Sequence, residues 1–364
     1  MHLAWAEIKD FRNHTRTRVR PIAEALTVAV GPNGEGKTNL LEALNFLFSL
    51  SSPRVSASLP MVRQGVTRAY LRGEIEGLGG KSLVEIELPS QGASKVQLNK
   101  HPVRRKRDLR KQVRSVFFGP EDLDLVRGDP SGRRRFLDEV VTGLWPLKES
   151  LLTAYDRVLR QRNRLLKEWE GRGVPTGLDA WDEELLEAGA AVIRARSDAV
   201  ELTAAPASEG FEALAGYGLE ISYASNVPAG DDLQERFRAR LAERRGDEIV
   251  RRTSLVGPHR DDLDLAVREL GARAFASHGE ASAAALCLRL GLATAIAGEI
   301  GEPPVLFVDD PFSALDPKRR DRLGDRLASR GGQVFISVAD EAHVPAVAHA
   351  TWDVSQGRVT PRKS

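Results

Sequence analysis

Apolar residues recur at two spacings along this chain, and these spacings predict strands near both ends and helices in the middle. Residues 3–8 alternate between apolar and polar as in a strand, and residues 26–30 form an unbroken apolar run that predicts another. The same reasoning predicts further strands at residues 70–75, 83–88, 96–98, 115–118, 219–223, 304–308 and 333–336.

Helical spacing dominates the middle of the chain. Residues 39–48 and 281–293 form helical patterns, and Asp129 is a candidate N-cap with Pro130 at the first helical position. Residues 231–245 predict a highly charged helix. Three further sets predict a compact arm of moderate helices, too interrupted for a long coiled coil, at residues 136–141, 151–166 and 185–200, with a linker at 171–177.

A glycine-rich stretch lies between the strand at 26–30 and the helix at 39–48. It fits G-x-x-x-x-G-K-[ST], whose glycines let backbone N–H groups face phosphates at a helix N-terminus. Lys37 can reach the β- and γ-phosphates, and the Thr38 hydroxyl can ligate Mg²⁺. The motif predicts that ATP binds with Mg²⁺ through Gly31, Pro32, Asn33, Gly34, Glu35, Gly36, Lys37, Thr38 and Asn39.

Two carboxylates, Asp309 and Asp310, end the apolar strand at 304–308. Beside a phosphate loop, the first acid holds Mg²⁺ and the second polarises the attacking water, so Lys37, Asp309 and Asp310 are the predicted catalytic residues. The acids follow Lys37 by 309 − 37 = 272 positions. A small kinase-like fold has no room for that separation, whereas a sheet interrupted by an inserted lobe does.

A second anion site is predicted just before the apolar helix at 281–293. Ser277, His278, Gly279 and Glu280 place a hydroxyl and free N–H groups at a helix start. Because the molecule already has a phosphate loop, this second site makes most sense if it meets the γ-phosphate held by another subunit. Ser313 and Asp316 follow the two acids, where such a homodimer needs a contact loop.

The ordered set of phosphate loop, Ser-x-Gly-Glu signature and Asp-Asp strand resembles an ABC-type ATPase head of DNA-repair proteins. The predicted fold is α/β, with a strand-rich flank and an inserted helical lobe. We expect residues 1–118 and 293–364 to form the ATPase lobe. Residues 119–292 then form the second lobe, which carries the helical arm at about 128–210 and the signature.

Composition limits the partners of the chain. The net charge of +2 predicts no polyanion partner by itself, so any basic surface must be local. The most basic window is either a solvated face or a DNA contact formed by Arg104, Arg105, Lys106, Arg107, Arg110 and Lys111.

Cys287 lies in an apolar helical run and predicts a core thiol. The N-terminus is too polar for a signal peptide and no apolar run approaches membrane-span length, so we expect a soluble, cytoplasmic protein without a membrane partner.

Several strings resemble the RecF family of bacterial recombination mediators nearly end to end. They are Phe11–Asn13, Gly31–Ala43, Phe118–Leu123, Gly128–Arg134, Phe136–Asp138, Gln161–Asn163, Trp181–Glu183, Gly257–Asp262 and Asp309–Asp310. The resemblance implies a weak ATPase that dimerises on ATP and binds double-stranded and gapped DNA. It also implies action with RecR and RecO to direct RecA onto gapped DNA.

Two departures from the family pattern concern the ATPase cycle. His278 and Glu280 stand where many relatives have other residues, and residues 338–339 supply no switch histidine. Slow hydrolysis is therefore expected. The equivalent of the glutamine loop is placed near residues 120–122.

Alternative functions are a head of the SMC type, serving a nuclease or a DNA-tethering complex, and a P-loop kinase for a small molecule. The absence of long heptad segments argues against the first, and the signature argues against the second. His259, Arg260, Asp261 and Asp262 could suggest a catalytic or metal cluster. Because neighbouring side chains point in different directions, a structural role is favoured.

Overall fold

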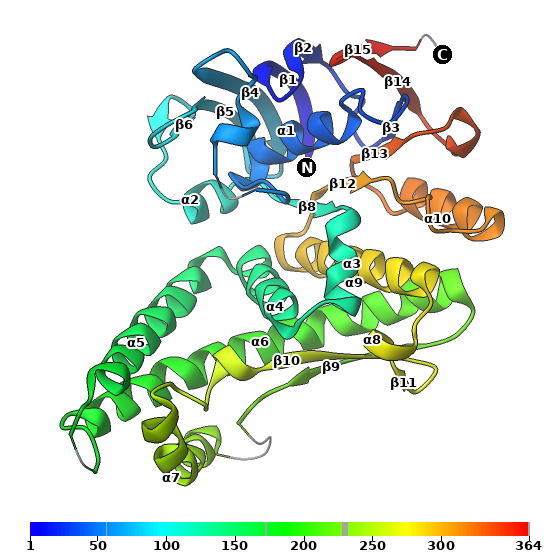
Figure 1. Cartoon of the computed structure of the whole chain (residues 1–364). Helices are drawn as coiled ribbons and strands as arrows, with labels where there is room; N and C mark the ends of the chain where they lie inside the picture. The colour runs from blue at the N-terminus through cyan, green and yellow to red at the C-terminus, as the bar shows by residue number, and fades with distance from the viewer. Residues whose placement is uncertain (56, 172, 228–231, 363–364) are drawn as a thin grey trace.

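The computed structural model describes the chain except for residues 56, 172, 228–231 and 363–364. Two large sheets form one end of the molecule and a group of helices forms the other (Figure 1). In the described residues, the first six-stranded sheet is antiparallel and has the order β2-β1-β4-β5-β6-β7. Its strands are β1 (His2–Phe11), β2 (His14–Val19), β4 (Arg68–Gly77), β5 (Gly80–Pro89), β6 (Lys95–Leu98) and β7 (His101–Pro102).

The second large sheet joins the two ends of the chain. Its order over the described residues is β15-β14-β3-β13-β12-β8, parallel from β14 to β8, with β15 antiparallel at the edge. Its strands are β3 (Leu26–Val30), β8 (Ser115–Phe118), β12 (Val305–Asp309), β13 (Val334–Val338), β14 (Ala350–Ser355) and β15 (Arg358–Pro361). The predicted strands of this sheet are confirmed, whereas β14 and β15 were not predicted.

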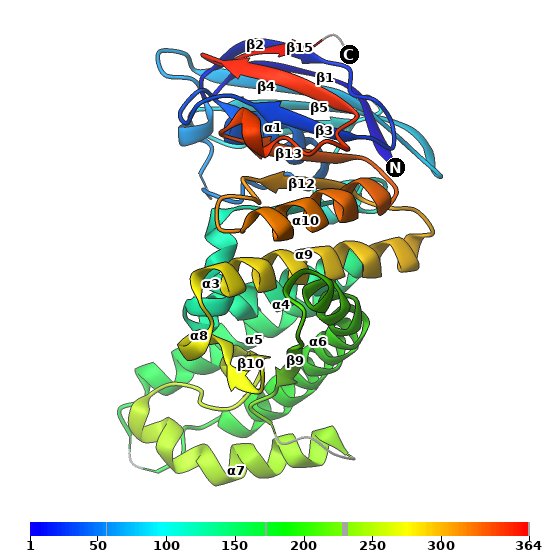
Figure 2. The ribbon, with the colours of Figure 1, turned by 90° about the vertical axis from the view of Figure 1, so that its right-hand side faces the viewer.

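The parallel sheet is buried on both faces, which explains its continuous apolar runs. Along β12, Val305 and Phe307 pack toward α1 (Lys37–Ser49) and the antiparallel sheet. Leu306 and Val308 belong to the other core, which contains α9 (His278–Ile300). The sheet therefore sits between the strand-rich flank and the helical lobe (Figure 2).

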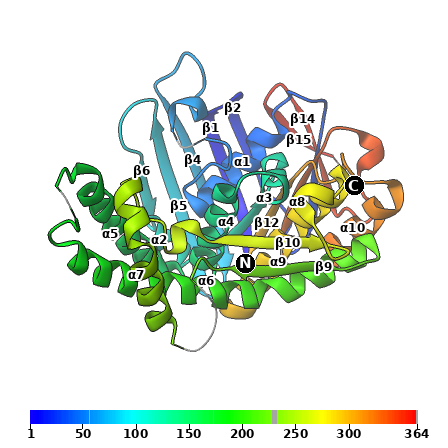
Figure 3. The same cartoon turned by 60° about the horizontal axis from the view of Figure 1, so that its bottom comes forward.

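The helical lobe is built around α6 (Leu178–Ala215) and α9. A Cβ on Gly291 of α9 would lie 2.6 Å from the carbonyl oxygen of Thr203, so this glycine permits the close approach of the two helices. The remaining helices of the described chain are α2 (Lys106–Arg110), α3 (Leu123–Arg127), α4 (Pro130–Leu144), α5 (Glu149–Glu168), α7 (Leu233–Arg251), α8 (Ala272–Phe275) and α10 (Pro317–Ser329). A small sheet of β9 (Leu219–Ala224), β10 (Asp262–Val267) and β11 (Leu270–Gly271) runs beside α6 (Figure 3).

Two expectations about the helices were wrong. The arm is not made only of moderate helices, because α6 continues for 38 residues through Pro206. The second concerns membrane-span length: α9 is long and apolar enough to meet that criterion, but 72% of its apolar window is buried inside the protein, as expected of a core helix. The position 292–293, predicted as a lobe boundary, lies within α9, which packs against both the sheet and α6.

Buried ion pairs hold the arm together. Arg162 of α5 is fully buried and donates to Asp182 of α6 at 2.8 Å and to Glu248 of α7 at 2.6 Å. Its third partner is the Ser254 hydroxyl, at 2.8 Å. The strings at 161–163 and 181–183 therefore meet as a structural junction, and Trp181 packs against the apolar core of the arm.

Candidate functional site

The phosphate loop turns on two glycines in the left-handed region. Gly34 has φ 87° and Gly36 has φ 113°, and Gly36 immediately precedes α1. A Cβ on Gly36 would lie 2.6 Å from the side-chain nitrogen of Asn13, and one on Gly31 would lie 2.2 Å from the carbonyl oxygen of Val354. Gly34 is therefore required for its conformation, Gly31 for space, and Gly36 for both.

Two residues that were not assigned to the site support this loop from the β1–β2 turn. The Asn13 amide donates to the Glu35 carbonyl at 3.0 Å and accepts from the Asn39 side chain at 2.9 Å. The buried His14 ring contacts the Gly36 carbonyl at 3.0 Å through Nε2, and burial lowers its pKa. The Glu35 carboxylate accepts from the Ser355 hydroxyl at 3.3 Å and from the backbone of Gln356.

The structure brings Lys37, Thr38 and Asp309 to the carboxyl ends of β3 and β12. The Lys37 ammonium donates to the carbonyls of Gly31 at 2.5 Å and Pro32 at 2.8 Å. The Thr38 hydroxyl lies 3.0 and 2.8 Å from the two carboxylate oxygens of Asp309. Burial lowers the pKa of Lys37 and raises the pKa of Asp309.

Ser337, at the end of β13, connects the two acids. Its hydroxyl donates to Asp309 Oδ1 at 2.5 Å and accepts from the Asp310 backbone N–H at 3.0 Å. Asp310 has φ 48°, a left-handed conformation that is uncommon outside glycine and therefore needs such support. Sequence reasoning did not identify Ser337, because a serine inside a buried strand has no distinguishing spacing.

These residues fit ATP with Mg²⁺. A threonine hydroxyl beside a carboxylate offers hard oxygen ligands, and Mg²⁺ typically takes one or two protein ligands besides phosphate and water. Consistent with this, no group of three or more His, Cys, Asp or Glu side chains that could form an all-protein metal site occurs in the described residues. Lys37 and the loop N–H groups provide the complementary positive charge for phosphates.

Arg54 lies next to this site and was not predicted. Its guanidinium donates to the Asn39 side chain at 2.9 Å and lies 3.5 Å from the buried Glu42. Its positive charge also lowers the pKa of Asp309, although burial has the larger, opposing effect. Glu42 is held in addition by two hydrogen bonds from Arg12, at 2.9 and 2.7 Å.

The predicted signature forms the N-terminus of α9. Ser277 is the N-cap, and its hydroxyl accepts from the Glu280 N–H at 3.2 Å while the Glu280 carboxylate accepts from the Ser277 N–H at 2.8 Å. Tyr217 donates to Glu280 at 2.5 Å, and these hydrogen bonds lower the pKa of Glu280 to about 2. Glu280 therefore stabilises the helix start, while Ser277 and His278 are exposed.

The signature and the predicted contact loop are neighbours in the same subunit. A Cβ on Gly279 would lie 2.9 Å from the carbonyl oxygen of Ala314. Ser313 and Asp316 on either side are exposed. Ser313 donates to the Asp310 carbonyl at 3.3 Å, and Asp316 caps α10 by accepting from the Arg319 N–H at 3.1 Å.

The basic window lies around α2. Arg104, Arg105, Lys106 and Lys111 are exposed, whereas Arg107 and Arg110 are half-buried. Arg105, Lys106 and Arg107 line an open groove of about 600 Å³, together with Arg157 of α5.

Other polar clusters have structural roles. The arginines of α7 include Arg238, Arg244 and Arg245, which pair with Glu183, Asp247 and the acids of α6. In the string at 257–262, Asp261 is buried and accepts from Arg196, Tyr223 and the Asn226 backbone. Arg133 binds Asp262 through two hydrogen bonds at 2.6 and 2.8 Å. Neither cluster has the open geometry of a catalytic or metal site.

Three further predicted residues lie in the helical lobe. Asp129 occupies the N-cap position of α4, but its side chain pairs with Arg273 at 2.9 Å and does not cap the helix. At the proposed glutamine-loop position, Asp122 is bound by Arg289 of α9 at 2.6 Å. Cys287 is a buried core thiol, as predicted, and burial raises its pKa to about 12.

Comparison with known proteins identifies the family. The family model described as the RecF/RecN/SMC N terminal domain matches residues 2–359. The DNA replication and repair protein RecF of Streptomyces avermitilis is 41% identical over 373 residues and covers 99% of both chains. That of Kineococcus radiotolerans is 39% identical and covers 95% of both chains.

Solved structures agree. The structure of the recombination mediator protein RecF-ATP in the RecFOR pathway has a TM-score of 0.88 at 27% identity, covering 100% of this chain and 98% of that one. A Pyrococcus furiosus Smc head domain has a TM-score of 0.59 at 14% identity and shares the fold alone. The predicted fold class and resemblance are thus confirmed, and the chain belongs to the RecF family of ABC-type ATPases.

Proposed function

We propose that this chain is an ATP-dependent, DNA-binding recombination mediator. In this proposal ATP joins two subunits, the dimer binds duplex and gapped DNA, and slow hydrolysis resets the dimer. The observation that carries the proposal is the exposed signature at the start of α9, which packs against the loop that follows Asp309 and Asp310. A second subunit could therefore meet the signature and the contact loop on one continuous surface.

Each nucleotide-site residue has a proposed task. Lys37 and the loop N–H groups bind and orient the phosphates, and Asp310 orients the attacking water. Thr38 and Asp309 would hold Mg²⁺, which when bound neutralises charge on the phosphates. Ser337 keeps both acids in place through its two hydrogen bonds. Without a histidine at 338–339, slow turnover remains the expectation.

The dimer contact follows from the geometry of α9. Ser277 and Gly279 would present a hydroxyl and helix N-terminal N–H groups to the γ-phosphate on the partner subunit. Ser313 and Asp316 would contact that subunit from the adjoining loop. Residues 1–118 with the C-terminal strands then act as the ATPase lobe, and the helices between them act as the lobe that presents the signature.

DNA is proposed to bind at the groove around α2. Arg104, Arg105 and Lys106 are exposed there, and the described residues place no carboxylate within ion-pair distance of any of them. Unpaired exposed cations are the groups that release counterions when they bind phosphates. The arginines of α7 are less suitable, because Arg238, Arg240, Arg244 and Arg245 already pair with acids.

The partners RecR, RecO and RecA are proposed from relatedness. The relative of known structure is described as a recombination mediator in the RecFOR pathway. An SMC-like head serving a nuclease remains the alternative, but no feature of this structure favours it over a mediator. The arm consists of α5 and α6 packed on one another, and it has no free coiled-coil extension in the described residues.

The test is binding of a labelled gapped duplex with ATP, with ADP and without nucleotide, over a range of salt concentrations. The wild type should bind tightly with ATP alone. Arg105→Gln combined with Lys106→Gln should lower the slope of log K against log salt by about 2, because each lost phosphate contact contributes about 0.9. Arg238→Gln combined with Arg244→Gln is the matched control, since these exposed arginines are paired. Nucleotide-independent binding, or an equal loss in the control, would contradict the proposal.

A further inference from the structure

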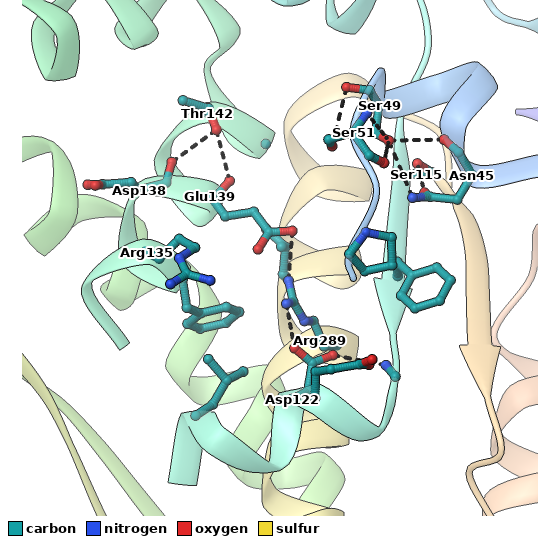
Figure 4. A pocket seen from close by; sticks show the side chains of 18 of the residues that line it. Asn45, Ser49, Ser51, Ser115, Asp122, Arg135, Asp138, Glu139, Thr142 and Arg289 are labelled. Atoms are coloured by element: carbon teal, nitrogen blue, oxygen red, sulfur yellow. Dashed lines mark hydrogen bonds and ion pairs between the residues drawn. The ribbon is translucent and has the colours of Figure 1, made fainter. Parts of the chain in front are cut away.

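A cavity of about 950 Å³ separates the ATPase lobe from the helical lobe. Its walls come from the end of α1, from β8 and the segment before it, and from α4 and α9, as Figure 4 shows for Asn45, Ser115, Thr142 and Arg289. β8 pairs with β12 from Ser115 and Val305 onward, whereas Asp309 is at the opposite end of β12. The end of the cavity at Ser115 therefore lies at the opposite end of β12 from Asp309, the proposed magnesium ligand.

Arg114 is the most unusual residue of this cavity. It is 93% buried, with a relative exposure of 7%, yet the described residues provide no carboxylate within ion-pair distance of it. Of its five side-chain N–H donors, only Nη1 has an acceptor in the described chain, the Val113 carbonyl at 3.3 Å, and Nε is buried without a partner. Leaving a buried guanidinium so poorly satisfied is costly, so its retention calls for a ligand.

Arg110 adds a second cation to the same wall. It also lines the cavity, and its one side-chain partner in the described structure is the Thr142 hydroxyl at 3.4 Å. Burial and the charge of Arg110 together lower the pKa of Arg114 to about 10. Two neighbouring cations that repel each other form a site that an anion would stabilise.

Several charged groups of the cavity wall, among them Arg289, Glu139 and Asp138, are already paired, whereas Arg135, Glu121, Asp124 and Glu149 line the cavity without an ion pair in the described residues. Arg289 binds Asp122 at 2.6 Å and Glu139 at 2.8 Å, as Figure 4 shows. Asp138 binds Arg196 at 2.7 Å. Asp122, Asp138 and Glu139 are therefore not free to compensate Arg110 and Arg114, and none of the other acids that line the cavity lies within ion-pair distance of either arginine in the described residues.

The backbone of Arg114 is fixed before any ligand binds. Its carbonyl accepts from the Val305 N–H at 3.2 Å, which ties it to β12. Phe48, Phe117 and Phe136 supply apolar walls, and the volume is within the range of small-molecule pockets. Because Arg114 is so deeply buried, a duplex about 20 Å wide cannot reach it, whereas a small anion can.

We propose that this interlobe cavity binds a phosphate-bearing small molecule, with Arg114 and Arg110 as the donors to its phosphate group. Neither donor belongs to the phosphate loop or to the exposed cations Arg104, Arg105 and Lys106, although Arg54, which lies beside the nucleotide site, also lines this cavity. The proposal does not depend on the proposed function, because it concerns binding by the isolated chain.

Two measurements test the proposal on the full-length protein. Wild type and variants are first saturated with Mg²⁺ and a non-hydrolysable ATP analogue, so that the phosphate loop cannot take up added anion. Inorganic phosphate is then titrated against chloride of equal ionic strength, with melting temperature and calorimetry as readouts. The wild type should gain roughly 2 °C at saturating phosphate, and Arg114→Met should gain nothing.

The second measurement compares the variants without phosphate. Arg114→Met should melt at or above the wild-type temperature, because removing an unsatisfied buried charge is neutral or stabilising. Arg133→Met is the matched control: this buried arginine is paired with Asp262, so its removal should lower the melting temperature while leaving the phosphate response intact. The proposal is overturned if phosphate acts no better than chloride, if Arg114→Met retains the response, or if Arg114→Met is destabilised as much as Arg133→Met.

Discussion

Ser337→Ala tests how the ATPase site is organised. The substitution removes the hydroxyl that donates to Asp309 at 2.5 Å and accepts from the Asp310 N–H at 3.0 Å, and it leaves a cavity of only one oxygen atom. A hydrogen bond to a charged group contributes about 1.5–3 kcal/mol, and losing a residue that orients a metal ligand typically costs 10–100-fold in metal affinity or activity. We therefore expect kcat/KM for ATP to fall by roughly 10–100-fold.

The pH dependence of the variant gives a second readout. Burial raises the pKa of Asp309, and the hydrogen bond from Ser337 is the largest of the influences that lower it. Without Ser337 that pKa must rise further. In its proposed role Asp309 has to be ionised to hold Mg²⁺. Activity should therefore be lost at a higher pH than in the wild type as the solution is acidified, and more Mg²⁺ should be needed for half-maximal activity.

The assay is steady-state ATP hydrolysis over a range of Mg²⁺ concentrations and pH values. Thr27→Val is the matched control, because this hydroxyl is buried in the neighbouring strand β3 and has no hydrogen-bond partner in the described residues. The control should hydrolyse ATP normally. If Ser337→Ala keeps wild-type kcat/KM and an unchanged acid limb, Ser337 does not position the acids and the reasoning is refuted.

Three further perturbations have defined outcomes. Gly36→Ala should weaken ATP binding by about 10–100-fold in calorimetry, because φ 113° is strained for alanine and its Cβ would displace Asn13; unchanged affinity would refute the loop geometry. Arg162→Met should lower the free energy of unfolding measured in urea by about 3–5 kcal/mol, because it breaks a buried ion pair. Its control, Arg164→Met, removes an exposed pair on the same helix and should cost less than about 1 kcal/mol. Equal losses would show that the buried pairing adds nothing. Burial lowers the pKa of His259 to about 4, so the unfolded chain binds a proton before the folded chain as the pH falls, and the free energy of unfolding should drop between about pH 6.5 and 4. His259→Gln should remove roughly 2 kcal/mol of that drop. A pH profile of stability identical to that of the wild type would contradict this prediction.

Much of the fold was predictable because local and global signals agree. The buried strands at 26–30 and 305–309 read as continuous apolar runs because the parallel sheet is covered on both faces. The phosphate loop was recognisable because its backbone conformation needs glycine at fixed positions, so the spacing of those glycines is visible in the sequence. The presence of an inserted helical lobe was predicted from the large number of residues between Lys37 and Asp309 in the sequence.

Other features depend on contacts that sequence spacing does not show. Asn13 and His14 reach the phosphate loop from a different strand pair, and Ser337 reaches Asp309 only because β13 lies beside β12. The length of α6 was underestimated because its apolar pattern weakens before Pro206, where packing on α9 maintains the helix. The burial of Arg114 within a run of basic residues was likewise invisible before the lobes were assembled.

The most direct test of the account is sedimentation of the wild type, Gly279→Asp and Gly279→Ala with Mg²⁺ and ATP, ADP or no nucleotide. Both substitutions place a Cβ 2.9 Å from the Ala314 carbonyl, so the alanine variant isolates that steric effect, and only the aspartate adds a charge facing a γ-phosphate. The account predicts ATP-specific dimers for the wild type, weaker ones for Gly279→Ala, and monomers for Gly279→Asp that still bind ATP. Dimers of Gly279→Asp as stable as those of the wild type would contradict the central claim that the signature closes on ATP held by a second subunit.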